Sequence, residues 1–578
     1  MLLGLLLPSD LSMHPDSVSI HSYLNKQSLP SFVQLSAFQK QIHAKSLEKT
    51  WDRVAVLGDN RVGHAGCVNA LHWAQGGELL LSAGDDTTVQ VWRTDPTDLS
   101  QNYPFVSRTV IHTGHKANIF NCNMLPYSSS RVVTVAGDKQ VRVFDVGRDQ
   151  GISPARQEYH ASRAMTHVFK CHEDRVKRIA SEESPDKFLT VSEVGVLHAF
   201  ISETIFIVFK DGTVRQHDLR TSHSCRSNCP APLIRVRHEL STIATASYNC
   251  VVAGDSPYVG NPGSKWISKM YSYFGRQAYL FDRRFTGRDL RDEWGSKGEG
   301  LTACVRRFGR PNQRASRKGH LFPGEHITGA RMSSDNGHEV LLSYSADGVY
   351  LFSTLDDPDS NNSFSSSIDR SLIPKRRKVT EPGPTSSASP SSSADSNDVE
   401  TDDEERETDD CSDDADDEDN IPSAESINYH PWVPTVYPRR RYAGARNVDT
   451  VKDVNFLGPR DEYVASGSDD GMFFVWHKST GKLRGVYEGD GTVVNVIEGH
   501  PHLPLVALFA PIDHESTFSR LNDADPIMRR NLHRSNIRTI RTIRRLDFVN
   551  LLAAVQGSSL GAEGDNDQFD AASDCVNQ

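Results

Sequence analysis

The sequence predicts an all-β protein, a seven-bladed β-propeller interrupted by a long insertion. Three stretches, starting at Gly63, Gly114 and Val451, share one order of elements: an apolar alternating strand, a turn, a second strand, a tight turn and a third strand ending in an aromatic residue. In each stretch a hydroxyl residue and an aspartate stand ten and six residues before that aromatic residue. A repeat with constant internal spacing is typical of blades that bury their faces only against one another.

The three clear repeats share polar residues that a blade can bury together. These residues, including the histidine of a Gly-His pair where one is present, are His64, Ser82, Asp86 and Trp92; His115, Thr134 and Asp138; and Ser466, Asp470 and Trp476. The pattern resembles the WD40 repeat, in which such side chains form a buried hydrogen-bonded network. A network of this kind satisfies polar turn atoms where blades pack on their neighbours.

Four weaker copies, starting at Cys171, Arg237, Glu325 and Gly491, bring the total to seven blades. The last copy lacks its hydroxyl-to-aromatic segment after LPLVAL (503–508), so we expect the seventh blade to be incomplete. Two explanations stay open. Either a piece of roughly eight or nine residues is missing, which leaves an open sheet edge, or the region around WDRVAVL (51–57) completes the blade.

The repeats define the domain organisation. We assign residues 51–355 to blades one to five and 438–515 to blades six and seven. Residues 1–50 are expected to be a partly helical N-terminal extension, and 516–578 a C-terminal extension. Residues 356–437 are rich in Ser, Pro and Asp and are predicted to be disordered, because they lack the apolar residues needed for a core.

The insertion carries two charge clusters of opposite sign. Lys375, Arg376, Arg377 and Lys378 resemble a nuclear import signal, which predicts a nuclear protein; a cytoplasmic pool and a merely solvated charge run are the alternatives. Residues 398–419 hold fifteen acids against Arg406, a balance of −14 within a net charge of −11, so the rest of the chain sums to +3. A near-neutral body argues against direct nucleic-acid binding.

Two segments interrupt blades three and four. Removing 194–210 places Thr190 ten residues before His217, which is the spacing of the intact repeats, and removing 259–277 restores the spacing before Phe281 in the same way. Both segments begin with Val and end with Lys or Gln, as translated introns can. We interpret them as short retained introns of a fungal-type gene model; the alternative is a pair of genuine loop insertions at blade edges.

Blades three and four end their third strands alike, with His or an aromatic residue followed by Asp-x-Arg. The sequences are HDLR at 217–220 and FDRR at 281–284. The aspartate can hold the strand-end turn, while the arginine presents a planar five-donor fork on the same rim. Blade two has Asp145 but Gly147, so the pairing is confined to two adjacent blades.

These boxes resemble the WDxR box of DCAF proteins, the WD40 substrate receptors of cullin-4 RING ubiquitin ligases, and in particular the subgroup with a double box. The similarity extends through RVKRIA, DGTVRQHDLR, VVAGDSPY and VKDVNFLGPRDEYVASGSDDG. It implies that Arg220 and Arg284, supported by Asp218 and Asp282, contact the damaged-DNA-binding adaptor protein of the ligase, and that another surface binds a protein substrate whose identity has no motif. His217 departs from the Trp of many members.

The sequence offers no sign of catalysis. It contains no nucleotide-binding glycine loop, no HExxH and no nucleophile–base spacing, so we expect no enzyme activity, no catalytic residue and no cofactor. The competing interpretations are a nuclear WD40 scaffold or chromatin-binding protein without ligase association and, more distantly, a propeller hydrolase. MLLGLLLP at the start and the apolar segment 194–210 are both too short to span a bilayer, so no membrane association is expected.

Nine cysteines without a CxxC pair are expected to be reduced thiols. Cys225 and Cys229, with His217 and His223 nearby, could form a zinc site. A polar loop after a strand is the simpler interpretation, and the sequence therefore predicts no metal.

Overall fold

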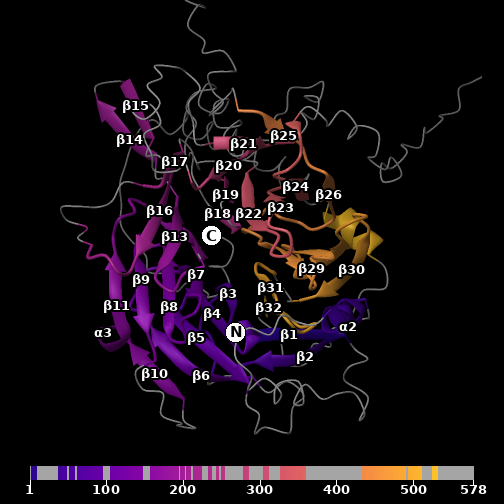
Figure 1. The fold of residues 1–578 in the computed structure, drawn as a ribbon, viewed down its shortest axis with the longest axis horizontal. Helices are drawn as coiled ribbons and strands as arrows, with labels where there is room; N and C mark the ends of the chain where they lie inside the picture. Colours follow the sequence, from indigo (N-terminus) through magenta and orange to yellow (C-terminus); the bar gives the residue numbers. More distant parts are fainter. Residues whose placement is uncertain are drawn as a thin grey trace, which may run out of the picture.

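The computed structural model is all-β, with sheets arranged around a central axis (Figure 1). It describes residues 2–8, 37–48, 51–58, 62–94, 105–147, 156–181, 183–193, 196–201, 204–209, 212–223, 225, 232–236, 242–246, 249–253, 277–284, 304–310, 326–358, 433–489, 493–510 and 524–531. The innermost strand of each sheet contacts that of the next, and the last contacts the first, so the ring is closed.

Six blades are formed by the internal repeats. Blade one contains β3 (Val68–Ala74), β4 (Leu79–Gly84), β5 (Thr88–Thr94), β6 (Phe105–His112) and β10 (Gln157–His160). Blade two contains β7 (Ile119–Met124), β8 (Arg131–Ala136), β9 (Val141–Asp145) and β11 (Met165–Phe169). Blade three contains β12 (Val176–Ser181), β13 (Lys187–Ser192), β16 (Gly212–Asp218) and β17 (Ile234–Val236).

The second half of the ring follows the same order. Blade four contains β18 (Thr242–Ala246), β19 (Asn249–Ala253), β20 (Ala278–Asp282), β21 (Cys304–Phe308) and β25 (Thr435–Val436). Blade five contains β22 (Ile327–Met332), β23 (Glu339–Tyr344), β24 (Val349–Ser353) and β26 (Arg440–Tyr442). Blade six contains β27 (Val454–Leu457), β28 (Tyr463–Gly467), β29 (Met472–His477) and β30 (Leu483–Glu488).

The remaining four-stranded sheet is composite and corrects the prediction of seven repeat-built blades to six. Its strands β31 (Ile497–Gly499) and β32 (Val506–Ala510) come from the weak last repeat, whereas β1 (Leu2–Pro8) and β2 (Trp51–Leu57) come from the N-terminal part of the chain. The strand β1 pairs with both β32 and β2. The strand β1 lies beside β32, in the place of the missing third strand, and the region around 51–57 forms the outer strand β2 next to it, so the second explanation holds only in part.

Trp51 packs the composite sheet against blade six. Its indole is 1% exposed and stacks on Tyr487, with ring centroids 5.2 Å apart. The indole N–H donates to the carbonyl of Leu47, at the end of α2 (Ala37–Leu47), and the same carbonyl accepts from Arg484 Nε of blade six at 3.1 Å. An aromatic side chain buried in this way is a large hydrophobic contribution to closing the ring.

The core lies between blades rather than within one. Facing surfaces of adjacent sheets share apolar clusters; one such cluster joins Ala70 and Leu81 of blade one to Cys122 and Val132 of blade two. The second strands are buried along nearly their whole length because a neighbouring blade covers each face. The tight turns that follow place Thr87, Lys139 and Gly471 at positive φ, which costs a non-glycine residue some strain and leaves glycine unstrained.

The interruption in blade three leaves its sheet in register. Ser192 of β13 pairs with Thr213 of β16, directly across the insertion. The inserted segment forms a separate hairpin of β14 (Val196–Ile201) and β15 (Thr204–Phe209), which projects from the ring (Figure 1). In blade four Ala253 pairs with Ala278 across the second interruption, most of which lies outside the described residues.

Besides α2, the described residues contain three short helical segments, one of which covers 525–531. α3 (Ala161–Ala164) connects β10 to β11, and a 3-10 turn at Gln75–Gly77 connects β3 to β4. Within the described part of the chain, no helix has both the length and the apolar character required to cross a bilayer.

Candidate functional site

Blades one and two contain the expected polar network. In blade one, His64 Nδ1 lies 2.9 Å from a carboxylate oxygen of Asp86, and its Nε2 lies 2.8 Å from Ser82 Oγ, which also accepts from Trp92 Nε1 at 2.8 Å. A carboxylate only accepts, so Asp86 sets the imidazole tautomer with the proton on Nδ1.

Blade two repeats this network without the indole. His115 Nδ1 lies 3.0 Å from Asp138, and its Nε2 lies 2.8 Å from Thr134 Oγ1. Phe144 is buried at the position of Trp92 and offers no donor. The network therefore holds the tight turn to the strand even when its aromatic member is apolar.

Blade six does not bring its predicted residues together. Trp476 Nε1 donates to the carbonyl of Ala443, and Ser466 Oγ donates to the carbonyl of Gly467 at 3.2 Å. Asp470 accepts from the backbone N–H of Met472 and from Arg530. No Gly-His pair precedes this blade in the sequence, so the histidine that would link hydroxyl and aspartate is missing.

Blade three has a network that the sequence analysis missed. Thr190 Oγ1 lies 2.7 Å from His172 Nε2 and 2.8 Å from His217 Nε2. Burial lowers the pKa of His217 to about 3 and that of His172 well below its ordinary value, so both rings are neutral. The sequence contains a signal for this network, because His172 precedes Thr190 by 18 residues, as His64 precedes Ser82. The signal is weakened because a cysteine replaces the glycine of the Gly-His pair.

The Asp-x-Arg box of blade three forms a closed turn at the end of β16. Asp218 Oδ1 accepts from the backbone N–H of Arg220 at 3.0 Å and from its Nε at 2.9 Å, while Oδ2 accepts from Arg220 Nη2 at 2.6 Å. The Arg220 side chain is 60% exposed, although its guanidinium is held by two parallel bonds. These hydrogen bonds keep the pKa of Asp218 well below its usual range, so the pair stays ionised at neutral pH.

The box of blade four has the same geometry at the end of β20. Asp282 Oδ1 accepts from the backbone N–H of Arg284 at 2.9 Å and from its Nε at 3.0 Å, and Oδ2 accepts from Arg284 Nη2 at 2.5 Å. The Arg284 side chain is also 60% exposed. Its hydrogen bond lowers the pKa of Asp282.

Sheet register places the two boxes on one rim. Asp218 pairs with Lys187, the first residue of β13, and Asp282 pairs with Asn249, the first residue of β19. Each aspartate therefore ends the third strand of its blade, and the inner strands of blades three and four are in contact. The structure thus presents two preformed guanidinium forks from adjacent blades toward the same side of the ring.

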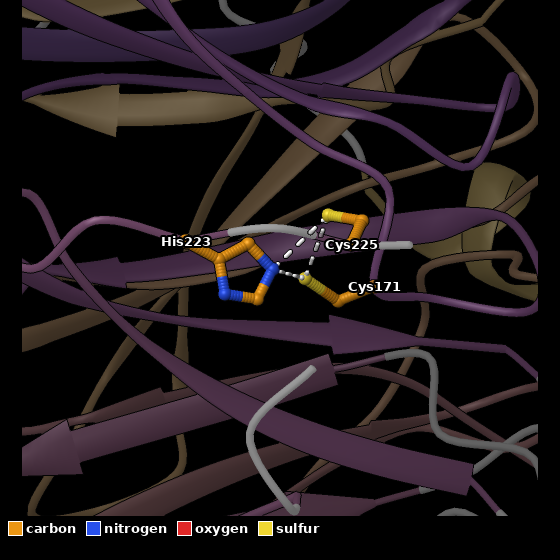
Figure 2. A group of neighbouring side chains, drawn as sticks. All are labelled: Cys171, His223 and Cys225. Carbon is orange, nitrogen blue, oxygen red and sulfur yellow. Dashed lines mark hydrogen bonds between the residues drawn. The ribbon is translucent and has the colours of Figure 1, made fainter. Parts of the chain in front are cut away.

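Two groups of side chains in the described residues could hold a metal ion. Cys171, His223 and Cys225 form one group (Figure 2), and His112, Glu158 and His160 form a more exposed one. His217, which the sequence analysis placed in a possible zinc site, instead belongs to the Thr190 network. Cys229 and the basic cluster at 375–378 lie outside the described residues.

The cysteines depart from expectation at one position. Cys122, Cys171, Cys225, Cys250 and Cys304 are free thiols. Cys67 is disulfide-bonded, so the expectation that every cysteine is reduced is wrong for Cys67.

Comparison with known proteins supports the repeat assignment. Residues 57–93 match the family model described as WD domain, G-beta repeat. A stretch of 340 residues is 30% identical to WD repeat protein iqw1 of Schizosaccharomyces pombe and covers 58% of this chain and 37% of that protein. A stretch of 311 residues is 32% identical to Protein ALTERED SEED GERMINATION 2 of Arabidopsis thaliana, with coverage of 50% and 34%.

The name of a third relative states the proteins with which that relative associates. DDB1- and CUL4-associated factor 6 of Homo sapiens is 27% identical over 297 residues, which cover 51% of this chain and 27% of that protein. The matched regions thus span between about a quarter and two fifths of these three relatives. The chain contains a WD40 repeat and is similar, at this distance, to a DDB1- and CUL4-associated factor.

Proposed function

We propose that this chain is a non-catalytic substrate receptor of a cullin-4 ubiquitin ligase. It docks on the damaged-DNA-binding adaptor through Arg220 and Arg284 and presents a protein substrate for ubiquitination. The basic cluster at 375–378 would direct it to the nucleus. The observation that carries the proposal is the pair of identical, exposed Asp-x-Arg turns on adjacent blades.

The geometry supports a docking role better than a structural one. An exposed ion pair contributes little to stability, because solvent screens it. The backbone bond of the turn does not require an arginine at the second position: in blade two, where Gly147 stands there, Asp145 Oδ1 accepts the N–H of Gly147 at 3.1 Å. The arginine side chains are therefore dispensable for the fold, whereas their preorganised forks suit carboxylate or carbonyl acceptors on a partner.

The similarity to a DDB1- and CUL4-associated factor indicates which partner to test. Arginines in the centre of an interface are often among the few residues that dominate affinity. Replacing each by alanine is expected to weaken adaptor binding by roughly 30-fold or more. The double variant should therefore lose the adaptor in a pull-down while its thermal unfolding stays unchanged.

Arg175 offers a matched control. It is 55% exposed and lies 2.8 Å from Glu193, which directly follows the last residue of β13, at the opposite end of that strand from Lys187 and Asp218. Arg175→Ala should leave adaptor binding intact. Equal adaptor recovery by the wild type, Arg175→Ala and the Arg220→Ala/Arg284→Ala double variant would refute the docking role and favour a WD40 scaffold without ligase association.

A further inference from the structure

Three metal-ligating side chains meet at the junction of blades two and three (Figure 2). Cys171 Sγ lies 3.1 Å from His223 Nε2 and 3.6 Å from Cys225 Sγ, and His223 Nε2 lies 3.0 Å from Cys225 Sγ. All three ligand atoms point at one another. Cys171 follows β11 of blade two, whereas His223 and Cys225 follow the Asp-x-Arg turn of blade three.

Hydrogen bonding alone does not account for this triangle. The imidazole Nε2 carries either one proton or one lone pair, so it can form one linear hydrogen bond, and two equally short contacts to both thiols would need a shared, weaker bond. A cation bound by two thiolates and a neutral imidazole would use all three ligand atoms at once.

The dimensions fit a tetrahedral zinc ion. With Zn–S near 2.3 Å and Zn–N near 2.0–2.1 Å, the edges of the tetrahedron are about 3.8 Å between sulfurs and about 3.6 Å between sulfur and nitrogen. The sulfur–sulfur distance is already within about 0.2 Å of this value, and the two sulfur–nitrogen distances would open by about 0.5 Å. Thiolate and imidazole ligands favour zinc over magnesium or calcium.

The surroundings favour bound thiolates. The backbone N–H of Lys170 donates to Cys225 Sγ at 3.2 Å, which stabilises negative charge on that sulfur. Cys171 is buried, and the ring of Phe169 lies 5.6 Å from the His223 ring and covers one side of it. Such outer contacts orient metal ligands and limit the access of water.

We propose that Cys171, His223 and Cys225 bind one Zn²⁺ ion as a structural site. The ion would fasten the segment after the blade-three turn to the outer strand of blade two and would link residues 54 positions apart. His217 takes no part, because its Nε2 is bound to Thr190. Three protein ligands leave a fourth position for water or another ligand. The site stands on its own geometry and does not depend on adaptor binding.

The first test is metal content. The full-length protein, purified without chelator, should retain about one zinc per chain by elemental analysis. Loss of an outer hydrogen-bonding partner alone costs roughly 10- to 100-fold in metal affinity, so Cys171→Ser or Cys225→Ser should lose at least that much. Cys304→Ser, at a free thiol of blade four outside the site, is the matched control and should retain zinc.

A second test needs no variant that risks misfolding. Cobalt added to the wild-type chain should give the intense near-ultraviolet bands of thiolate-to-cobalt charge transfer, and zinc should displace it. A chelator should lower the thermal midpoint of the wild type, since metal binding that requires the fold stabilises the fold.

Three results would overturn the site. One is zinc retained equally by the wild type, Cys171→Ser and Cys225→Ser, which would mean adventitious binding. Another is a cobalt spectrum without thiolate bands. The third is a Cys171–Cys225 disulfide, detected by mass spectrometry, in protein expressed and purified with zinc present throughout, which would show redox pairing instead.

Discussion

Asp145, Asp218 and Asp282 form the same turn at the ends of three third strands, yet an arginine follows only two of them. The carboxylate accepts the N–H two residues on, and this bond is indifferent to the side chain at that position. In blade five the matching position is Leu355, whose N–H donates to Ser353 Oγ and whose side chain is 72% exposed. The side chain that ends the strand therefore determines the turn, and the residue two positions later determines which side chain the rim presents to a partner.

Thr190 provides a test of the blade-three network. Thr190→Val removes the only atom shared by His172 and His217 and leaves two buried imidazole nitrogens without that partner. An unsatisfied buried polar group costs about 1–3 kcal/mol, so the loss of a partner for two nitrogens should lower the free energy of unfolding by about 2–6 kcal/mol. Urea denaturation at pH 7 measures this change.

Thr134→Val is the paired comparison, because Thr134 Oγ1 contacts one histidine, His115. Its loss should be about half as large, roughly 1–3 kcal/mol. If the two variants lose equal stability, the hydroxyl of Thr190 does not bridge both rings.

Residue spacing predicted some of these contacts and could not predict others. The ten-residue separation of Ser82 from Trp92 identified their hydrogen bond, because one blade brings them together. Trp476 has the same separation from Ser466 but donates to Ala443, since the missing histidine removes the partner that orients the hydroxyl. Cys171 escaped notice as a ligand because it precedes Cys225 by 54 residues and lies in the connection between blades two and three, so only the packing of these blades places the two thiols side by side.

At the scale of elements, the strands β13 and β16 show how a sheet tolerates an interruption. Thr190 pairs with Arg215 and Ser192 with Thr213, so the blade forms as if residues 194–210 were absent. A one-residue slip would turn every side chain to the other face, which the burial of Val191 and Val214 forbids. The spacing argument from sequence predicted this register, although it could not predict that the inserted residues would form a hairpin.

Deleting residues 194–210 should therefore preserve the fold. The deletion joins Glu193 to Asp211 and gives a turn like those of blades one and two. Shortening a loop reduces the entropic cost of closing it on folding, so the thermal midpoint should stay the same or rise by a few degrees. Differential scanning calorimetry of the full chain and the deletion compares them directly.

A deletion variant that fails to fold, while the full chain folds, would show that the hairpin is an integral part of blade three.

Sequencing the transcript is an independent check of the retained-intron interpretation. Messages that mostly contain both inserted segments would contradict it.

For the whole molecule, closure of the ring depends on contacts between chain segments far apart in sequence. The repeat count predicted a propeller but not how its last sheet is completed, since β1 and β2 carry no repeat motif. Their pairing with β32 follows from a general physical need: an unpaired strand edge exposes backbone donors and acceptors. From the sequence we could state only the two alternatives for the last blade, a missing piece or completion by the N-terminal region. Pairing between strands hundreds of residues apart leaves no local sequence pattern that would decide between them.

His500 makes this closure sensitive to acid. It is 8% exposed, its Nε2 lies 3.2 Å from the carbonyl of Gly77 in blade one, and its Nδ1 accepts the backbone N–H groups of His502 and Leu503. Gly77 adopts φ +95°, and a Cβ there would overlap the His500 ring, so the contact is tightly packed. Protonation of Nδ1 would break both backbone hydrogen bonds.

Burial lowers the pKa of His500 to about 3, far below the value near 6.5 expected in the unfolded chain. Between these values the unfolded state binds a proton that the folded state does not, so stability falls as the pH drops below about 6.5. This histidine alone contributes about 1.4 kcal/mol per pH unit to that fall. His217, also lowered to about 3 by burial, adds a similar slope.

The variant His500→Gln separates the contribution of His500 to this pH dependence from that of His217. The glutamine does not titrate and can still donate to Gly77, so the variant should be less stable at pH 7 but should lose stability less steeply between pH 6 and pH 5. Urea unfolding at a series of pH values gives the slope of each protein. Identical slopes for the wild type and His500→Gln would mean that His500 is protonated in the folded chain as readily as in the unfolded one, which its two accepted backbone hydrogen bonds oppose.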